Sequence, residues 1–223
     1  MNDRPIFRIN KDPVSWATHA AGFVAAVVGP VFLVVYSAHD PAKVTAMSIY
    51  GGSLVLLFGA STVYHFLDLG PKRNGLLRRF DHVGIFVLIA GTYVPVLIHL
   101  LEGGWRITLL SVVGTLALLG AGFRVWWIDP PPWLGMGIYL ALGWIGLIPA
   151  YKIAPQLDLS SAGFLVAGGL SYTVGAAVFT KEWPDPWPKV FGHHEIWHLF
   201  VLAGAAGHFC FVWDLMAMPV PHF

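Results

Sequence analysis

The chain has 223 residues, of which 57% are hydrophobic and only 11% are charged. Soluble domains carry about 25% charged residues, so this composition excludes an ordinary soluble protein and indicates an integral membrane protein. The formal net charge of +1 gives no basis for binding nucleic acid. A single cysteine, Cys210, excludes a disulfide within the chain.

Seven stretches of the sequence are long and apolar enough to cross a membrane, which takes about 20 residues. Turn-forming stretches such as "DPPPW" and "EWPDPWPKVFGHH" separate them. Because little sequence remains for a soluble domain, we predict one all-α domain over residues 1–223, a bundle of seven transmembrane helices. The predicted spans are about 16–38, 43–67, 81–101, 106–128, 134–152, 161–180 and 195–217.

Lysine and arginine are divided unequally between the two sides of this predicted bundle. The positive-inside rule therefore predicts a cytoplasmic N-terminus and, after seven crossings, a C-terminus outside. The residues on the N-terminal side are Arg4, Arg8, Lys11, Lys72, Arg73, Arg78, Arg79, Arg124, Lys181 and Lys189, against Lys43, Arg106 and Lys152 on the other side.

Polar side chains gather at the predicted cytoplasmic ends of the second, third and seventh spans. Ionisable groups inside membrane spans are costly, which makes them functional candidates by default. The topology alone brings five polar groups to one membrane depth, and His19 of the first span lies nearby. The five are Ser61, His65, Asp81, His194 and His198.

This group has the composition of a zinc site. His194 and His198 are four residues apart, so one helical face carries both. With His65 across from them they would form a three-histidine site, which leaves one position for water, as catalytic zinc sites do. Asp81 could then act as a general base toward that water, and Ser61 could donate a hydrogen bond to it or to a substrate carbonyl.

Each of the five residues also has a purely structural interpretation. His65 could cap carbonyl groups at a helix end, and Asp81 could be a helix N-cap or pair with the arginines before it. Ser61 could bond the carbonyl four residues earlier. His194 and His198 could be polar residues of the membrane interface.

Three neighbours are expected to lie outside the cluster. His193 precedes the face that the other two histidines of its span share, and Glu195 points away from that face, toward a basic loop residue. His208 lies deep in the seventh span, where we expect it to hydrogen-bond between helices.

Four stretches carry a family resemblance: "THAAG" at 18–22, "GASTVYH" at 59–65, "RRFDHVGIFVLIAGTYVP" at 78–95 and "HHEIWHLFVLAGAAGHF" at 193–209. Through them the chain resembles, over nearly its whole length, the hemolysin III family, the bacterial branch of the progestin and adipoQ receptor family. The resemblance implies a multi-pass protein of the bacterial plasma (inner) membrane with a zinc site near its cytoplasmic face. It also implies that His65, His194 and His198 hold the zinc and that Asp81 reaches it through water.

Three functional hypotheses follow. Because the related alkaline ceramidases share the serine, the aspartate and the three histidines, the first is a zinc-dependent intramembrane hydrolase whose partner is a membrane lipid, an amide or an ester. The second is a non-enzymatic protein of membrane homeostasis or sensing, with a structural zinc. The third is a channel-forming cytolysin, as the family name says, although the spans lack the repeated polar face of a wide pore. The sequence carries no signal for an oligomeric state.

Overall fold

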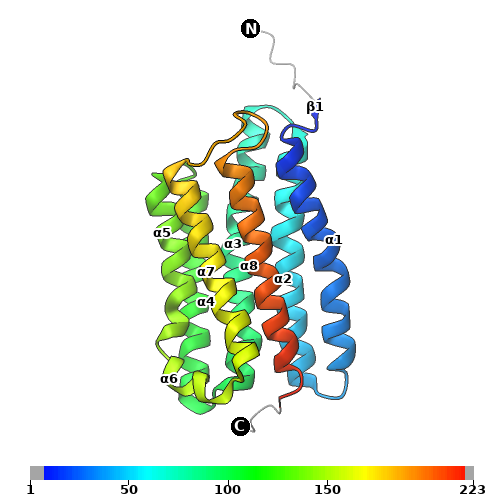
Figure 1. Ribbon diagram of the computed structural model, residues 1–223, viewed down its shortest axis with the longest axis vertical. Helices are drawn as coiled ribbons and strands as arrows, with labels where there is room; N and C mark the ends of the chain where they lie inside the picture. Colours follow the sequence, from blue (N-terminus) through cyan, green and yellow to red (C-terminus); the bar gives the residue numbers. More distant parts are fainter. Residues whose placement is uncertain (1–7, 219–223) are drawn as a thin grey trace.

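The computed structural model describes residues 8–218 and consists of long helices that run side by side (Figure 1). Arg4, one of the cations in the predicted charge asymmetry, lies outside the described residues. Proline opens four of the helices, because its fixed φ and missing N–H suit the first turn. These are α1 (Pro13–Tyr36), α2 (Pro41–Phe66), α3 (Pro71–Leu100) and α5 (Pro132–Gly143).

Within the described residues, six helices are long and apolar enough to cross a membrane, and a bent pair counts as a seventh span if its two parts are taken together. α1 begins and α8 ends at opposite ends of the bundle (Figure 1). The predicted all-α membrane bundle is therefore confirmed. The remaining long helices are α4 (Gly103–Trp126), α7 (Leu159–Lys181) and α8 (His193–Leu215).

The fifth span is not the continuous helix that the sequence predicted. α5 continues into the 3-10 turn η1 (Trp144–Leu147), and after a bend of 43° the chain forms α6 (Ala150–Ile153) and η2 (Ala154–Gln156). The hydroxyl of Tyr93, on α3, donates to the Gly143 carbonyl at 2.6 Å and accepts from the Gly146 N–H at 2.8 Å. This hydroxyl satisfies backbone groups that the break leaves without helical partners.

The third helix begins ten residues before the predicted start of its span. Gly70 adopts a φ of 83°, which favours glycine, and Pro71 then opens α3. Hydropathy had suggested a start at residue 81, because the first three turns are basic. Asp81 therefore lies well inside the helix, and its interpretation as an N-cap is wrong.

A short antiparallel pairing ties the start of the chain to the end of α2. β1 (Arg8–Ile9) pairs with β2 (Leu67–Asp68), and the N–H of Asp12 donates to the His65 carbonyl at 3.0 Å. The segment that leads into α1 is thereby held against the last turn of α2.

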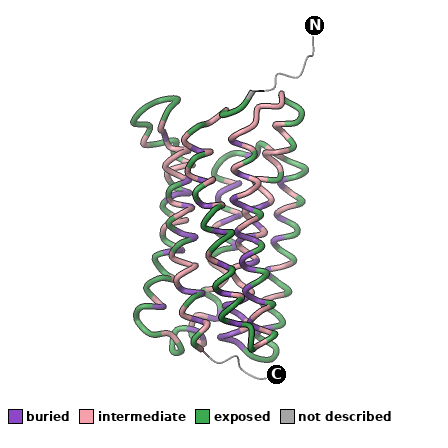
Figure 2. The backbone as a smooth tube through the Cα atoms, turned by 90° about the vertical axis from the view of Figure 1, so that its right-hand side faces the viewer, coloured by how far each residue is buried: buried purple, intermediate pink, exposed green. Residues whose placement is uncertain are grey.

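Apolar side chains fill the bundle and also cover its outside. Figure 2 shows buried positions on the faces that helices turn toward one another and exposed positions along the outward faces. Many outward residues are large and apolar, for example Leu118 and Val24, which are 76% and 62% exposed. Such a surface would promote aggregation in water, whereas hydrocarbon solvates it well.

Small residues allow α7 and α8 to pack closely. A Cβ atom added to Gly175 of α7 would lie 2.6 Å from the Cβ of Phe200 and 2.8 Å from the ring of Trp197, both on α8. Close approach through glycine is a common mode of helix packing in membranes, where van der Waals contact drives association.

Gly175→Ala should therefore destabilise the bundle. The added methyl group meets a backbone-proximal carbon that cannot rotate away, and overpacking of this kind costs about 1–3 kcal/mol. Gly163→Ala, on the same helix but with nothing within 4 Å, is the matched control and should leave stability unchanged or slightly raised. Denaturant unfolding in detergent measures both, and equal stabilities for the two variants would contradict the packing argument.

Candidate metal centre

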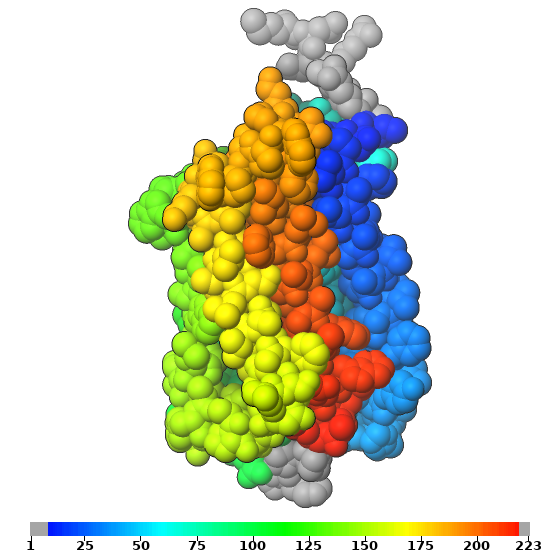
Figure 3. All heavy atoms as spheres, viewed as in Figure 1, coloured from blue at the N-terminus to red at the C-terminus, as the bar shows by residue number. Residues whose placement is uncertain are grey.

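Three histidines from two helices meet at the end of the bundle where α1 begins. His65 lies in the last turn of α2, and His194 and His198 lie in the first two turns of α8. Each ring offers one nitrogen, and the three nitrogens lie within 4.8 Å of one another. Figure 3 shows the start of α8 (orange) directly beside the start of α1 (dark blue) at this end. The structure thus brings together the three predicted ligands.

The ring nitrogens of this cluster fit a metal ion. The Nδ1–H of His65 donates to the Asp12 carboxylate at 2.9 Å, and Nδ1 of His198 lies 3.3 Å from the Ser15 carbonyl. An imidazole that donates through Nδ1 carries its lone pair on Nε2. The Nε2 atoms of His65 and His194 are buried without a hydrogen-bond partner in the described part of the chain. A shared divalent ion would satisfy them, and imidazole suits zinc and several other first-row metals.

Ser61 and Asp81 adjoin the histidines, as the topology predicted. Ser61 is buried one turn before His65, and Asp81 reaches it from α3. The Asp81 carboxylate accepts a hydrogen bond from the Ser61 hydroxyl. The arrangement therefore sets a carboxylate and a hydroxyl beside the possible metal position.

Several structural interpretations of these residues do not match their contacts. Ser61 shares a 2.6 Å hydrogen bond with Nδ1 of His19, instead of bonding the carbonyl four residues earlier. Arg78, which precedes Asp81 by one turn, forms its ion pair with Asp129. The polar contacts of these residues join separate helices at the site.

Of the neighbours of the cluster, Glu195 departs from its expected contact and His208 makes it. The expected basic partner of Glu195 is wrong, because its carboxylate accepts from the Gly192 N–H and from the Ser15 hydroxyl, both at 2.9 Å. It thus caps α8 and links that helix to α1. His208 hydrogen-bonds the backbone of Leu165 on α7, as expected for an interhelical contact.

Sequence reasoning placed His19 near the cluster but missed Asp12 and Ser15, which contact it from the same side of the chain as His19. Asp12, Ser15 and His19 each contact a residue of the cluster, and their spacing of three and four places them on one side of the helix. The ring of His19 also stacks on that of His198, with centroids 3.7 Å apart and planes 12° from parallel. The spacing is visible in the sequence, but only the fold shows that this side faces the histidines.

Asp12 is a carboxylate at neutral pH. Partial burial by itself would raise its pKa, but the hydrogen bond with His65 and the positive charge of Lys11, 3.5 Å away, outweigh it. The pKa of Asp12 therefore lies below its ordinary value, and the site includes a fixed negative charge.

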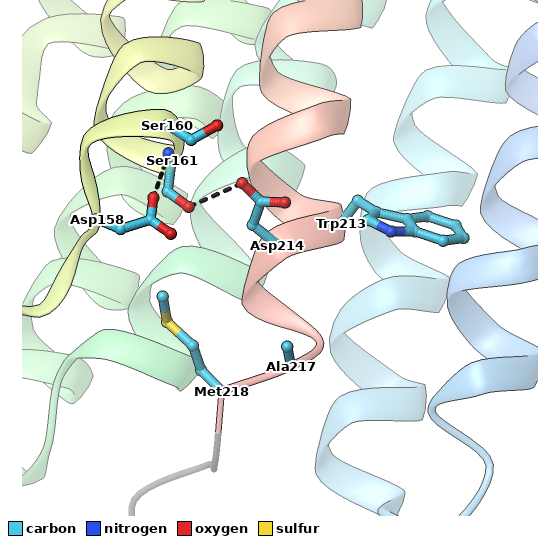
Figure 4. A pocket seen from close by; sticks show the side chains of 7 residues that line it. All are labelled: Asp158, Ser160, Ser161, Trp213, Asp214, Ala217 and Met218. Atoms are coloured by element: carbon cyan, nitrogen blue, oxygen red, sulfur yellow. Dashed lines mark hydrogen bonds between the residues drawn. The ribbon is translucent and has the colours of Figure 1, made fainter.

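A surface hollow near the end of α8 does not belong to this site. It is lined by Asp158, Ser161 and Asp214, and the Ser161 hydroxyl donates to Asp214 at 2.8 Å while its N–H donates to Asp158 at 2.7 Å (Figure 4). Asp214 follows His198 by sixteen residues on α8, about 24 Å along the helix axis. Asp158 is the N-cap of α7, and the bond from Ser161 to Asp214 joins α7 to α8.

Taken together, the fold and the site define a multi-pass membrane protein with a buried cluster of three histidines at one end of its helical bundle. The family model described as "Haemolysin-III related" matches residues 7–209, and the chain therefore belongs to this family. The resemblance drawn from the four sequence stretches is confirmed.

Similar proteins support the same assignment. The "Hemolysin-3 homolog" of Bacillus subtilis (strain 168) is 34% identical, over 96% of this chain and 99% of its own length. "Hemolysin-3" of Bacillus cereus is 35% identical, over 85% of this chain and 84% of its own. The "Adiponectin receptor protein" of Drosophila melanogaster is 28% identical, over 92% of this chain and 51% of its own.

Metal content offers a direct test of the histidine cluster. Protein purified in detergent should carry about one divalent transition-metal ion per chain. His65→Ala and His198→Ala should each lose it, because each removes a ligand from a different helix. The matched control is His99→Ala, since His99 is equally buried but lies eighteen residues beyond Asp81 on α3, about 27 Å away. Elemental mass spectrometry measures all four proteins, and a wild-type chain that takes up no added zinc would contradict the site.

Proposed function

We propose that the protein is a zinc-dependent intramembrane hydrolase that acts on a lipid amide or ester at the cytoplasmic face. One observation carries this proposal: three histidine nitrogens within 4.8 Å of one another adjoin a hydrogen-bonded serine and aspartate. Metal-assisted hydrolysis needs a metal-binding set of this kind with a base and a hydrogen-bond donor beside it.

The number of ligands favours catalysis over a structural zinc. Structural zinc sites are normally closed by four protein ligands, whereas catalytic sites use three and leave a position for water or substrate. In the described part of the chain the metal-ligating group contains three residues, all histidines. Asp81 approaches from a third helix and contacts Ser61, which leaves its carboxylate available for proton transfer.

The residues of the chain have distinct roles in the proposed reaction. When bound, zinc supplies Lewis-acid polarisation of the substrate carbonyl and a water of lowered pKa. Asp81 accepts a proton from the attacking water as its oxygen bonds to the carbonyl carbon. As Asp81 takes up this proton, the Ser61 hydroxyl is released from that carboxylate and donates to the oxygen on which negative charge develops. Asp81 then returns the proton to the leaving nitrogen or oxygen as the bond to carbon breaks.

The membrane location supports the proposed substrate class, a lipid. The outward faces of the helices are apolar, so a substrate with acyl chains can reach the bundle from the side. Three clusters of buried apolar residues fill the interior. This packing favours the hydrolase over a pore through a single chain, although two relatives are named hemolysins.

Turnover by a detergent-purified, zinc-loaded protein tests the proposal. A panel of lipid amides and esters, analysed by mass spectrometry, should include at least one that is hydrolysed. Asp81→Ala should reduce turnover by about 100-fold or more, the usual contribution of a general base, and should still bind zinc. Asp214→Asn is the control, since this carboxylate lies sixteen residues beyond His198 on α8, about 24 Å along the helix axis.

Two results would contradict the proposal. If the zinc-loaded wild type hydrolyses none of the lipids in the panel, the metal centre has no hydrolytic role. Unchanged turnover in Asp81→Ala would remove this residue from the mechanism.

A further inference from the structure

The side chain of Asp12 does not cap α1, although Asp12 occupies the capping position. Asp12 is the N-cap residue of α1, where an aspartate normally accepts a hydrogen bond from the N–H groups of the first turn. Its side chain makes no such bond. Asp40, the N-cap of α2, shows the usual behaviour and accepts from the N–H groups of Ala42 and Lys43. The carboxylate of Asp12 is instead directed to another helix.

On that helix it contacts His65, a residue that is 2% exposed. Asp12 Oδ2 lies 2.9 Å from Nδ1 of His65, while Nε2 of the same ring is buried without a partner among the described residues. A carboxylate at Nδ1 selects the tautomer that carries its proton there and its lone pair on Nε2. It also holds the ring plane and makes Nε2 a stronger ligand.

The backbone holds Asp12 in this position. The N–H of Asp12 donates to the His65 carbonyl, so the two residues are joined twice, once through the backbone and once through the side chains. The pairing of β1 with β2 anchors the segment just before Asp12.

We propose that Asp12 is a positioning residue of the metal centre, which sets the tautomer and orientation of His65 and so raises its affinity for a divalent metal ion. The inference rests on the proposed metal site. It adds that the chain before α1 is part of this site, because that chain supplies a negative charge behind one of its ligands.

Zinc affinity of the full-length protein in detergent tests this inference, measured by competition with a chromophoric chelator. Asp12→Asn keeps a hydrogen-bond acceptor but removes the charge, and Asp12→Ala removes both. Loss of such an outer contact typically lowers metal affinity about 10-fold to 100-fold, so Asp12→Ala should approach the upper value and Asp12→Asn the lower one. Asp12→Glu should recover part of the loss, and Asp214→Asn, about 24 Å from His198 along α8, should bind zinc like the wild type.

Two further measurements separate positioning from folding. The melting temperature of the chelated protein should be the same for Asp12→Asn and the wild type, because no capping bond is lost. With cobalt in place of zinc, the visible absorption of Asp12→Asn should shift, since the ligand field of His65 changes.

The outcomes distinguish this inference from the proposed function. Wild-type zinc affinity in both Asp12→Asn and Asp12→Ala would overturn the inference alone. An equal fall in melting temperature with and without metal would also overturn it, by showing a structural role. A wild-type chain that binds no zinc would overturn both, whereas weakened zinc binding without any lipid turnover would support the inference and remove the hydrolase.

Discussion

The structure depends on how buried imidazole nitrogens are satisfied at one end of a membrane bundle. An unpaired polar group in a low-dielectric interior costs several times more than the same group in water. His65 and His194 each have a buried Nε2 atom with no hydrogen-bond partner in the described part of the chain. Together with His198, these residues offer three ring nitrogens within 4.8 Å of one another. A cation shared between them relieves this cost better than any single side chain, which is why the cluster indicates a metal.

The same constraint explains why the N-terminal helix packs where it does. The N-cap residue and the first two turns of α1 present a carboxylate, a carbonyl and an imidazole toward α2 and α8. Each contacts a buried polar group of one of those helices. Because Glu195 of α8 also accepts from the hydroxyl of Ser15, the three helices are cross-linked by polar contacts at this end. Elsewhere they are joined mainly by apolar packing.

This division between a polar end and an apolar interior suits chemistry on a lipid. Membrane helices lack a hydrophobic force to drive them together, so small residues and a few polar contacts determine their positions. The glycines of α7 and α8 provide the close approach, and the histidine end provides the polar contacts. A reacting group held at that end would be within reach of the interface, while an acyl chain lay against apolar helices.

Much of the architecture was determined by the sequence itself. Hydropathy depends on local composition, so the membrane spans could be located without a structure, and the four-residue spacing of His194 and His198 ensured that they share a face. Basic residues at the start of α3 lowered the local hydropathy, so its first three turns were not predicted as part of the span. The continuous apolar run of the fifth span predicted an unbroken helix, whereas the chain bends there by 43°. Both errors arise because apolar content predicts which residues lie in the lipid, but it does not predict where a helix begins or breaks.

Only the tertiary structure decided which partners the polar side chains take. Asp12 and His65 are 53 positions apart, and Ser61 and His19 are 42 apart, so no local pattern relates them. Their contacts depend on the rotation and the axial shift of one helix against another, which follow from the packing of whole faces. The sequence therefore determined which residues lie at the end of the bundle, whereas the helix register decided that α1 faces the histidines.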